Sequence, residues 1–126
     1  MNVVDSSGWL EYLADAPNAA AFAPIIEDSS NVVVPAVVLL EVGRRVWQQR
    51  GEASATATMQ LLAAHKIVVM DEAIATRAVA LGLRYRLAMA DSIILATAEA
   101  VGATVWSQDS DFESVPGVRF LPKPGE

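Results

Sequence analysis

Short runs of β-branched residues alternate along the chain with longer stretches that are rich in alanine and leucine. The runs typical of strands span residues 2–4, 31–34, 66–70, 104–106 and 117–121. The alanine-rich stretches favour helix and span residues 6–14, 17–27, 36–50, 53–64, 72–85 and 90–101. Strands that alternate with helices imply parallel pairing through right-handed crossovers. The pattern predicts an α/β fold, a three-layer helix–sheet–helix sandwich around a central, mostly parallel sheet of about five strands.

Residues at the expected boundaries agree with these elements. Asp5 or Ser6 can cap the first helix and Asp71 the fifth, because aspartate and serine are favoured N-cap residues. Gly102 follows the sixth helix in a position typical of a C-terminal glycine. The chain has no internal repeat, linker or low-complexity segment. We expect residues 1–121 to form a single domain and residues 122–126 to be a frayed tail.

Composition narrows the class of protein. The chain has 126 residues, of which 53% are apolar, and this suits one domain with its own core. No stretch approaches the roughly 20 apolar residues of a membrane span, and the N-terminus lacks the features of a signal peptide. There is no cysteine, which excludes disulfides and thiolate metal sites. These features predict a cytoplasmic protein.

The net charge of −6 is unevenly distributed. Residues 1–43 hold six acids and no lysine or arginine, whereas residues 44–126 hold nine acids and nine bases. Such a chain is not a general nucleic-acid coat, which needs a basic footprint. An acidic enzyme can still act on a polyanion where cations and a local basic rim help. The candidates for that rim are two groups of arginines: Arg44, Arg45 and Arg50, and Arg84 and Arg86.

Four acids interrupt or directly follow apolar segments: Asp5, Glu41, Asp91 and Asp109. A carboxylate in an apolar setting is costly unless it is paired, hydrogen-bonded or metal-bound. In open α/β sheets, ligands bind at the carboxyl ends of the strands. Asp5 and Asp109 follow strands at that edge, and the other two acids lie near the starts of helices that can reach it. The positions predict a shared site for a divalent cation.

Each acid also has a purely structural interpretation. Asp5 and Asp91 could be helix caps. Glu41 could form a surface ion pair with an arginine three or four residues further on, and Asp109 could lie in a solvated turn. The prediction of a site therefore depends on all four acids sharing one edge.

Other chemistries find less support. His65 is the only histidine, has no catalytic partner near it in sequence and is expected to be an ordinary surface residue. The chain has neither the Gly-x-Ser-x-Gly motif of serine hydrolases nor a glycine-rich phosphate loop. Trp9, Trp47 and Trp106 are expected to pack in the core or an interface rather than to stack on bases.

Four segments, taken in order, resemble a PIN-domain ribonuclease, and most closely a VapC-like toxin of a type II toxin–antitoxin pair. They are Val3-Val4-Asp5-Ser6-Ser7, Val34-Pro35-Ala36 leading to Leu40-Glu41-Val42, Leu87-Ala88-Met89-Ala90-Asp91-Ser92 followed by Ala96-Thr97-Ala98, and Trp106-Ser107-Gln108-Asp109-Ser110-Asp111-Phe112. Together they cover nearly the whole chain. Each motif alone is weak, but their order and spacing are specific. Trp106 departs from the aliphatic residue usual at its position.

The resemblance implies a catalytic quartet at Asp5, Glu41, Asp91 and Asp109. All-oxygen ligands select hard cations, so Mg²⁺ or Mn²⁺ is expected as cofactor. Asp5, Asp91 and Asp109 are the expected metal ligands, bound directly or through water. Glu41 is expected to orient the attacking water or to complete a second metal position.

Two further residues of the last motif have supporting roles by the same resemblance. Ser107 occupies a position usually held by a threonine whose hydroxyl supports the site. Asp111 matches a frequent additional acid and is ranked as secondary.

The resemblance also implies an endoribonuclease that acts on structured RNA such as transfer RNA, a VapB-like antitoxin that blocks the acidic pocket, and a homodimer. The candidate RNA contacts are four arginines: Arg44, Arg45, Arg84 and Arg86.

Two alternatives remain open. One is a catalytically silent α/β binding domain. The other is a phosphoacceptor receiver domain, in which Asp71 would be the acceptor.

Overall fold

The computed structural model describes residues 1–124. Its strands are β1 (Asn2–Val4), β2 (Val33–Pro35), β3 (Lys66–Val68), β4 (Thr104–Ser107) and β5 (Arg119–Phe120). Its α-helices are α1 (Ser6–Leu13), α2 (Ala19–Ile26), α3 (Ala36–Arg50), α4 (Glu52–Ala63), α5 (Glu72–Tyr85) and α6 (Met89–Val101). Two short 3-10 helices, η1 (Ser29–Asn31) and η2 (Ser110–Phe112), complete the secondary structure.

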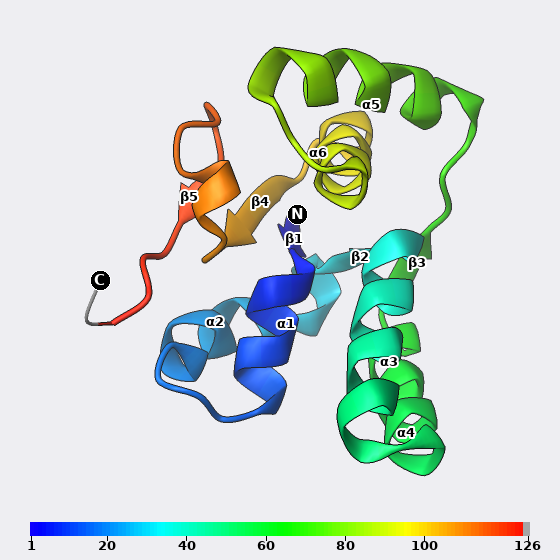
Figure 1. The fold of residues 1–126 in the computed structure, drawn as a ribbon, viewed down its shortest axis with the longest axis vertical. Coiled ribbons are helices and arrows are strands. Elements are labelled where there is room, and N and C mark those ends of the chain that lie inside the picture. The colour runs from blue at the N-terminus through cyan, green and yellow to red at the C-terminus, as the bar shows by residue number, and fades with distance from the viewer. Residues whose placement is uncertain (125–126) are drawn as a thin grey trace.

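All strand pairs are parallel. One sheet has the order β1-β4-β5, and β2 pairs with β3 in a second. An isolated parallel bridge between Asn2 and Val32 joins them, which gives the overall order β3-β2-β1-β4-β5 (Figure 1). The prediction of a parallel sheet of about five strands is confirmed. The order reverses direction at β1, so the crevice beside the carboxyl ends of β1 and β4 is the topological switch point.

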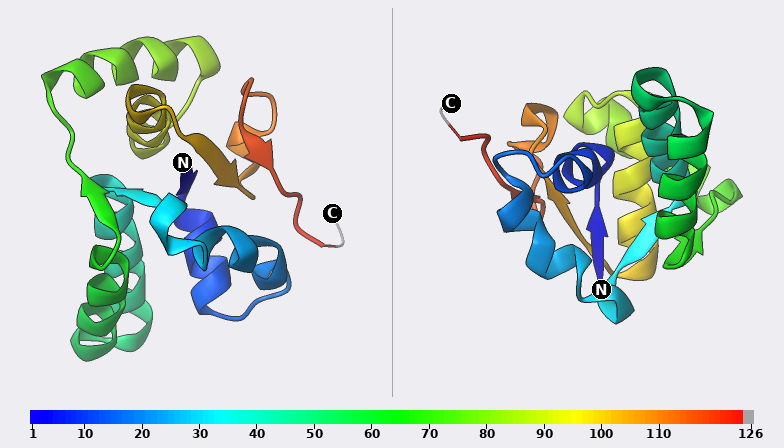
Figure 2. Two further views of the ribbon diagram at one scale, coloured as in Figure 1. Left: turned by 180° about the vertical axis from the view of Figure 1, so that it is seen from behind. Right: turned by 90° about the horizontal axis from the view of Figure 1, so that it is seen from below.

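Helices cover the strands on both sides. Figure 1 shows α5 and α6 on one side and α1 and α2 on the other, and α6 contacts β1, β2 and β4. The α3 and α4 helices form a hairpin that extends from the β2–β3 end, as both views of Figure 2 also show. The expected three-layer sandwich is therefore present. No helix within residues 1–124 is long and apolar enough to cross a membrane.

The main core lies between the central strands and the helices that cover them. Its largest fully buried side chains are Trp9 and Phe22. Val3 and Val4 point to opposite faces of β1, and both are fully buried. Burial on both faces explains why β1 and β2 contain consecutive valines rather than an alternating pattern.

The predicted boundaries of α3 and α5 agree with the structure at both ends. Asp71 caps α5, accepting a hydrogen bond of 2.8 Å from the Ile74 N–H, and Gly102 follows α6 with a φ of 68°. The second helix begins at Ala19, two residues later than predicted, and the predicted strand at 66–70 ends at Val68. Part of the predicted tail is held by a hydrogen bond of 3.2 Å, which Asn18 Nδ2 donates to the Pro122 carbonyl oxygen. Residues 125–126 of that tail lie outside the described part of the chain.

Candidate active site

Asp5 follows β1 and is only 2% exposed. Its Oδ1 caps α1 by accepting a hydrogen bond of 2.9 Å from the Gly8 N–H, and Ser7 Oγ donates to the same oxygen at 2.8 Å. Ser107 Oγ donates to Oδ2 at 2.6 Å. Burial raises the pKa of Asp5 to about 6, although the hydrogen bonds from Ser107, Gly8 and Ser7 lower it. Asp5 is thus both a helix cap and a buried carboxylate that is costly to ionise.

Asp91 lies in the first turn of α6 but does not cap it. The N-cap residue is Ala88, which has no side-chain hydrogen bond, so the interpretation of Asp91 as a cap is wrong. Burial raises the pKa of Asp91 to about 7. Four negative charges add to that rise, those of Asp109, Asp5, Glu41 and Asp111. The four predicted acids, together with Asp111, therefore lie around one point.

Three of these carboxylates converge closely. One carboxylate oxygen from each of Asp91, Asp109 and Asp111 lies within 4.8 Å of the others. Asp109 Oδ1 accepts a hydrogen bond of 2.9 Å from the Asp111 N–H and so begins the turn of η2. The predicted turn exists, but it directs two carboxylates toward Asp91.

Glu41 is half-buried on α3. Ser6 Oγ donates a hydrogen bond to its Oε1. Within residues 1–124 the only ion pair joins Arg77 to Glu99, so the interpretation of Glu41 as the partner of a nearby arginine is wrong. Glu41 keeps its charge directed to the acidic cluster rather than to a cation of its own helix.

The four candidate RNA-binding arginines are all exposed. Arg44 and Arg45 lie on α3 beyond Glu41. Arg84 lies over the ring of Tyr85 at 5.4 Å, and Arg86 ends α5 in the left-handed conformation with a φ of 56°. Within residues 1–124, none of these side chains forms an ion pair with the acidic cluster.

A buried polar network next to the site was missed from the sequence. Gln108 Nε2 donates to Glu11 Oε1 at 3.0 Å, and Asn18 Nδ2 donates to Gln108 Oε1 at 3.2 Å. The Asn18 N–H donates to the other oxygen of Glu11 at 2.8 Å. The signal for Gln108 is its place between Ser107 and Asp109. Nothing in the local sequence marks Asn18, which lies 90 residues away.

The aromatic residues and the histidine lie outside this chemistry. Trp9 is buried in the core as predicted, and Trp106 Nε1 donates to Asn2 Oδ1 at 2.9 Å. Trp47 is 53% exposed, so its expected place in an interface stays a prediction. His65 is half-buried against the edge of Trp9, with 5.4 Å between ring centroids.

The residues present fit a divalent cation. The convergent groups are oxygen ligands only, as Mg²⁺ and Mn²⁺ prefer. Burial is the main cause of the raised pKa values of Asp5 and Asp91, and repulsion from neighbouring carboxylates raises them further. A bound cation would relieve that repulsion.

The sequence model of the PIN domain matches residues 3–118. The chain belongs to the PIN-domain family. No curated protein sequence matches it. Among solved structures, this PIN domain is similar to a toxin–antitoxin complex from Klebsiella pneumoniae, with 26% identity, a TM-score of 0.77, and coverage of 94% of this chain and 95% of that chain.

Two more distant structures share the fold. One is Mycobacterium tuberculosis VapC20, a toxin that cleaves the Sarcin-Ricin loop, with 17% identity, a TM-score of 0.76 and coverage of 97% and 100%. The other is FitAcB from Neisseria gonorrhoeae, with 22% identity, a TM-score of 0.73 and coverage of 97% and 98%.

The receiver-domain alternative does not fit this PIN domain. Receiver domains have the strand order 2-1-3-4-5, whereas the order here is 3-2-1-4-5. Asp71, the acceptor in that alternative, is exposed and caps α5.

Proposed function

We propose that this PIN domain is a metal-dependent endoribonuclease that hydrolyses phosphodiester bonds in RNA and acts as the toxin of a toxin–antitoxin pair. The observation that carries the proposal is the convergence of acids around Asp91 at the switch point of the sheet. The similarity to the Klebsiella toxin–antitoxin complex supports the biological role. The RNA substrate places the enzyme in the cytoplasm, and structured RNA such as transfer RNA is the proposed substrate class.

In this proposal, Asp91 and Asp109 hold the cation together with Asp5. Asp111 joins them as a candidate ligand, because its carboxylate lies within 4.8 Å of those of Asp91 and Asp109. A bound Mg²⁺ or Mn²⁺ would neutralise phosphate charge and lower the pKa of a bound water. The rigid hydrogen bonds to Asp5 fix where its free lone pairs point, and this is the preorganisation that a ligand needs.

Glu41 has a different role. Its carboxylate is held by Ser6, an arrangement that leaves Oε2 without a hydrogen-bond partner among the described residues. We assign Glu41 the orientation of the attacking water, in line with the bond to be broken. Arg44, Arg45, Arg84 and Arg86 would contact RNA phosphates on the rim of the site.

The proposed partners are a VapB-like antitoxin and a second copy of the chain. Val79, Leu83 and Met89 are 65%, 79% and 82% exposed and line an apolar cavity of about 470 Å³ between α5 and the start of α6. An exposed apolar patch of this kind marks an interaction surface. We assign this surface to the homodimer.

The decisive test of the function is cleavage of RNA by the purified protein with Mg²⁺, with Mn²⁺ and with a chelator. We expect cleavage with either cation and none with the chelator. Asp91→Asn, purified identically, is the control against a contaminating nuclease and should be inactive. Expression of the wild type without an antitoxin should arrest growth, and Asp91→Asn should not.

A catalytically silent binding domain is the remaining alternative. It predicts RNA or protein binding without cleavage under any of these conditions. Cleavage that is equal in the wild type and in Asp91→Asn would also contradict the proposed enzyme.

A further inference from the structure

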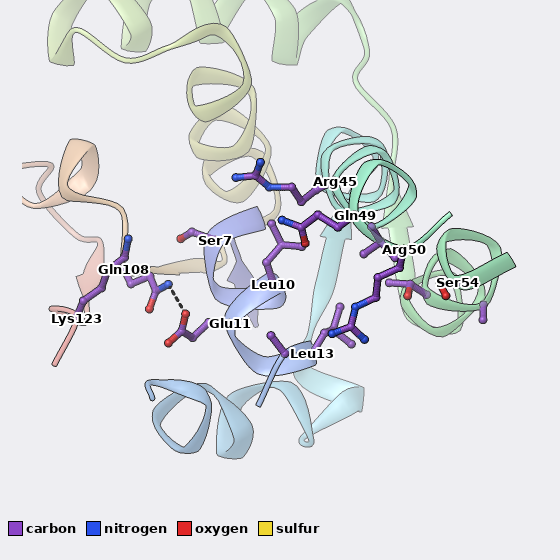
Figure 3. Close-up of a pocket in the computed structure, with 14 residues that line it drawn as sticks. Ser7, Leu10, Glu11, Leu13, Arg45, Gln49, Arg50, Ser54, Gln108 and Lys123 are labelled. Atoms are coloured by element: carbon purple, nitrogen blue, oxygen red, sulfur yellow. Dashed lines mark hydrogen bonds between the residues drawn. The ribbon is translucent and has the colours of Figure 1, made fainter. Parts of the chain in front are cut away.

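A groove of about 590 Å³ lies over the outer face of α1 (Figure 3). Ser7, Leu10, Glu11 and Ala14 form its floor, since residues three and four apart share one face of a helix. In Figure 3, Arg45, Gln49 and Arg50 come from the α3 side of this floor, and Gln108 and Lys123 lie on the opposite side. The groove is thus walled by segments far apart in the sequence.

The groove adjoins the acidic site through two of its lining residues, Ser7 and Gln108. Ser7, at one end of the floor, donates hydrogen bonds to both oxygens of Asp5, at 2.8 and 3.0 Å. On the other wall, Gln108 lies in the chain between Ser107 and Asp109. A polymer with one bond at the acids can therefore continue into the groove without leaving the surface.

The charge of the groove is opposite to that of the site. Arg45, Arg50 and Lys123 are exposed, and none of them forms an ion pair within residues 1–124. Among residues 1–124, Glu11 is the only acid that lines the groove. Both of its oxygens accept hydrogen bonds, from Gln108 Nε2 and from the Asn18 N–H. The groove thus holds three basic side chains that form no ion pair within residues 1–124. Its one acid among these residues already accepts hydrogen bonds from the protein.

We propose that the RNA strand on one side of the cleaved bond lies in this groove, with its backbone phosphates on Arg45, Arg50 and Lys123. This inference rests on the proposed function and assigns a binding role to Arg50 and Lys123. The basic side chains lie on both walls of the groove, so that they can contact the phosphates of a polyanionic strand from either side. No aromatic side chain lines it, so binding is through phosphate and sugar and carries little sequence preference.

The experiment compares two double variants that each remove one arginine and one lysine. Arg50→Ala/Lys123→Ala removes one basic side chain from each wall of the groove. Arg77→Ala/Lys66→Ala removes the same charge from exposed sites outside the groove and is the matched control. Dissociation constants for an RNA oligonucleotide are measured in an Asp91→Asn background over 50–200 mM salt, and KM and kcat in the active background.

We expect the groove variant to bind RNA roughly 2- to 30-fold more weakly at physiological salt, as for two exposed charge contacts. Its salt dependence should flatten by about 1.4 in slope, at about 0.7 per phosphate of a single strand. KM should rise more than kcat falls. The charge-preserving exchange Arg50→Lys/Lys123→Arg should retain most of the slope, while the control variant should stay close to wild type.

Unchanged affinity and slope in the groove variant would overturn the proposal, and so would an equal loss in the control. If Arg50→Ala/Lys123→Ala instead loses only the binding of an antitoxin peptide, the groove is a protein site and the proposal is wrong. Failure of the proposed function is a separate result, because the wild type would then cleave no RNA while the binding arm still reports on the groove.

Discussion

Ser107 joins the ends of two strands through one hydroxyl group. It donates a hydrogen bond of 2.6 Å to Asp5 Oδ2 and accepts one of 2.9 Å from the Asp109 N–H. Ser107 is fully buried. The side chain that follows β1 and the turn that follows β4 are therefore held in a fixed relation before any cation binds.

This relation predicts the effect of removing the hydroxyl. Ser107→Ala should lower kcat by about 10- to 100-fold, the usual cost of losing a group that orients a metal ligand. It should also weaken the apparent affinity for Mg²⁺ measured by titration. Ser107→Thr keeps the hydroxyl and should retain most of the activity. Equal activity in the alanine and threonine variants would show that the hydrogen bond does not orient Asp5.

Much of the fold is encoded locally, and so it was predictable. The short runs typical of strands and the alanine-rich stretches predicted every strand and α-helix. The caps at Asp5 and Asp71 were predicted because they depend on residues next to each other in sequence. The two 3-10 helices were missed, since such short turns have no hydrophobic period to recognise.

The site was predictable only in part, for a physical reason. Asp5 and Asp109 could be placed because parallel strands put their carboxyl ends at one edge. Whether Asp111 is a principal or a secondary acid of the site depends on how η2 directs its side chain, and no pattern in the sequence gives that direction. The network of Glu11, Asn18 and Gln108 joins helix α1 and the residue before α2 to the loop after β4. The contacts of Gln108 span 90 residues or more, and no local pattern in a single sequence reveals them.

The central position of Asp91 predicts a graded response to amide substitution. Asp91→Asn should lower kcat/KM by at least ~100-fold, the lower range for a positioned catalytic group, and we expect a similar loss for the amides of Asp5, Glu41 and Asp109. Asp111 is exposed and should contribute less, so Asp111→Asn should cost less activity and shift mainly the Mg²⁺ titration midpoint. Full activity in Asp91→Asn would remove the assignment, and an equal loss in Asp111→Asn would make Asp111 a principal ligand.

The apolar surface of α5 predicts how the homodimer would be disrupted. Leu83→Glu places a charge in the proposed interface, where it would be desolvated without a partner. We expect this variant to sediment as a monomer at concentrations where the wild type is a dimer. Leu61→Glu, at another exposed leucine on α4, is the control and should leave the assembly unchanged. A monomeric wild type, or a Leu83→Glu variant that stays dimeric, would contradict the assignment.

The burial and the crowding of Asp5 and Asp91 predict how the stability of the metal-free protein depends on pH. In the folded state the pKa of Asp91 is raised to about 7 and that of Asp5 to about 6, from a usual 3.8. Between about pH 4 and pH 7, the folded protein therefore binds protons that the unfolded chain does not. By linkage, this contribution to the free energy of unfolding falls as the pH rises through that window.

Asp91→Asn removes the carboxylate with the largest pKa shift. Comparing this variant with the wild type therefore isolates the effect of that shift on the free energy of unfolding. In chelator at pH 8 the free energy of unfolding of the variant should be no lower than that of the wild type. The expected gain is at most roughly 1 kcal/mol once solvent screening is allowed for. At pH 5 the difference should shrink, because Asp91 is then protonated in the folded wild type. Adding Mg²⁺ at pH 8 should stabilise the wild type, as a ligand of the folded state does, and Asp91→Asn much less. Thermal melts of both proteins at the two pH values, with and without Mg²⁺, provide the test. Parallel curves with identical responses to Mg²⁺ would mean that Asp91 shares no site with the other acids.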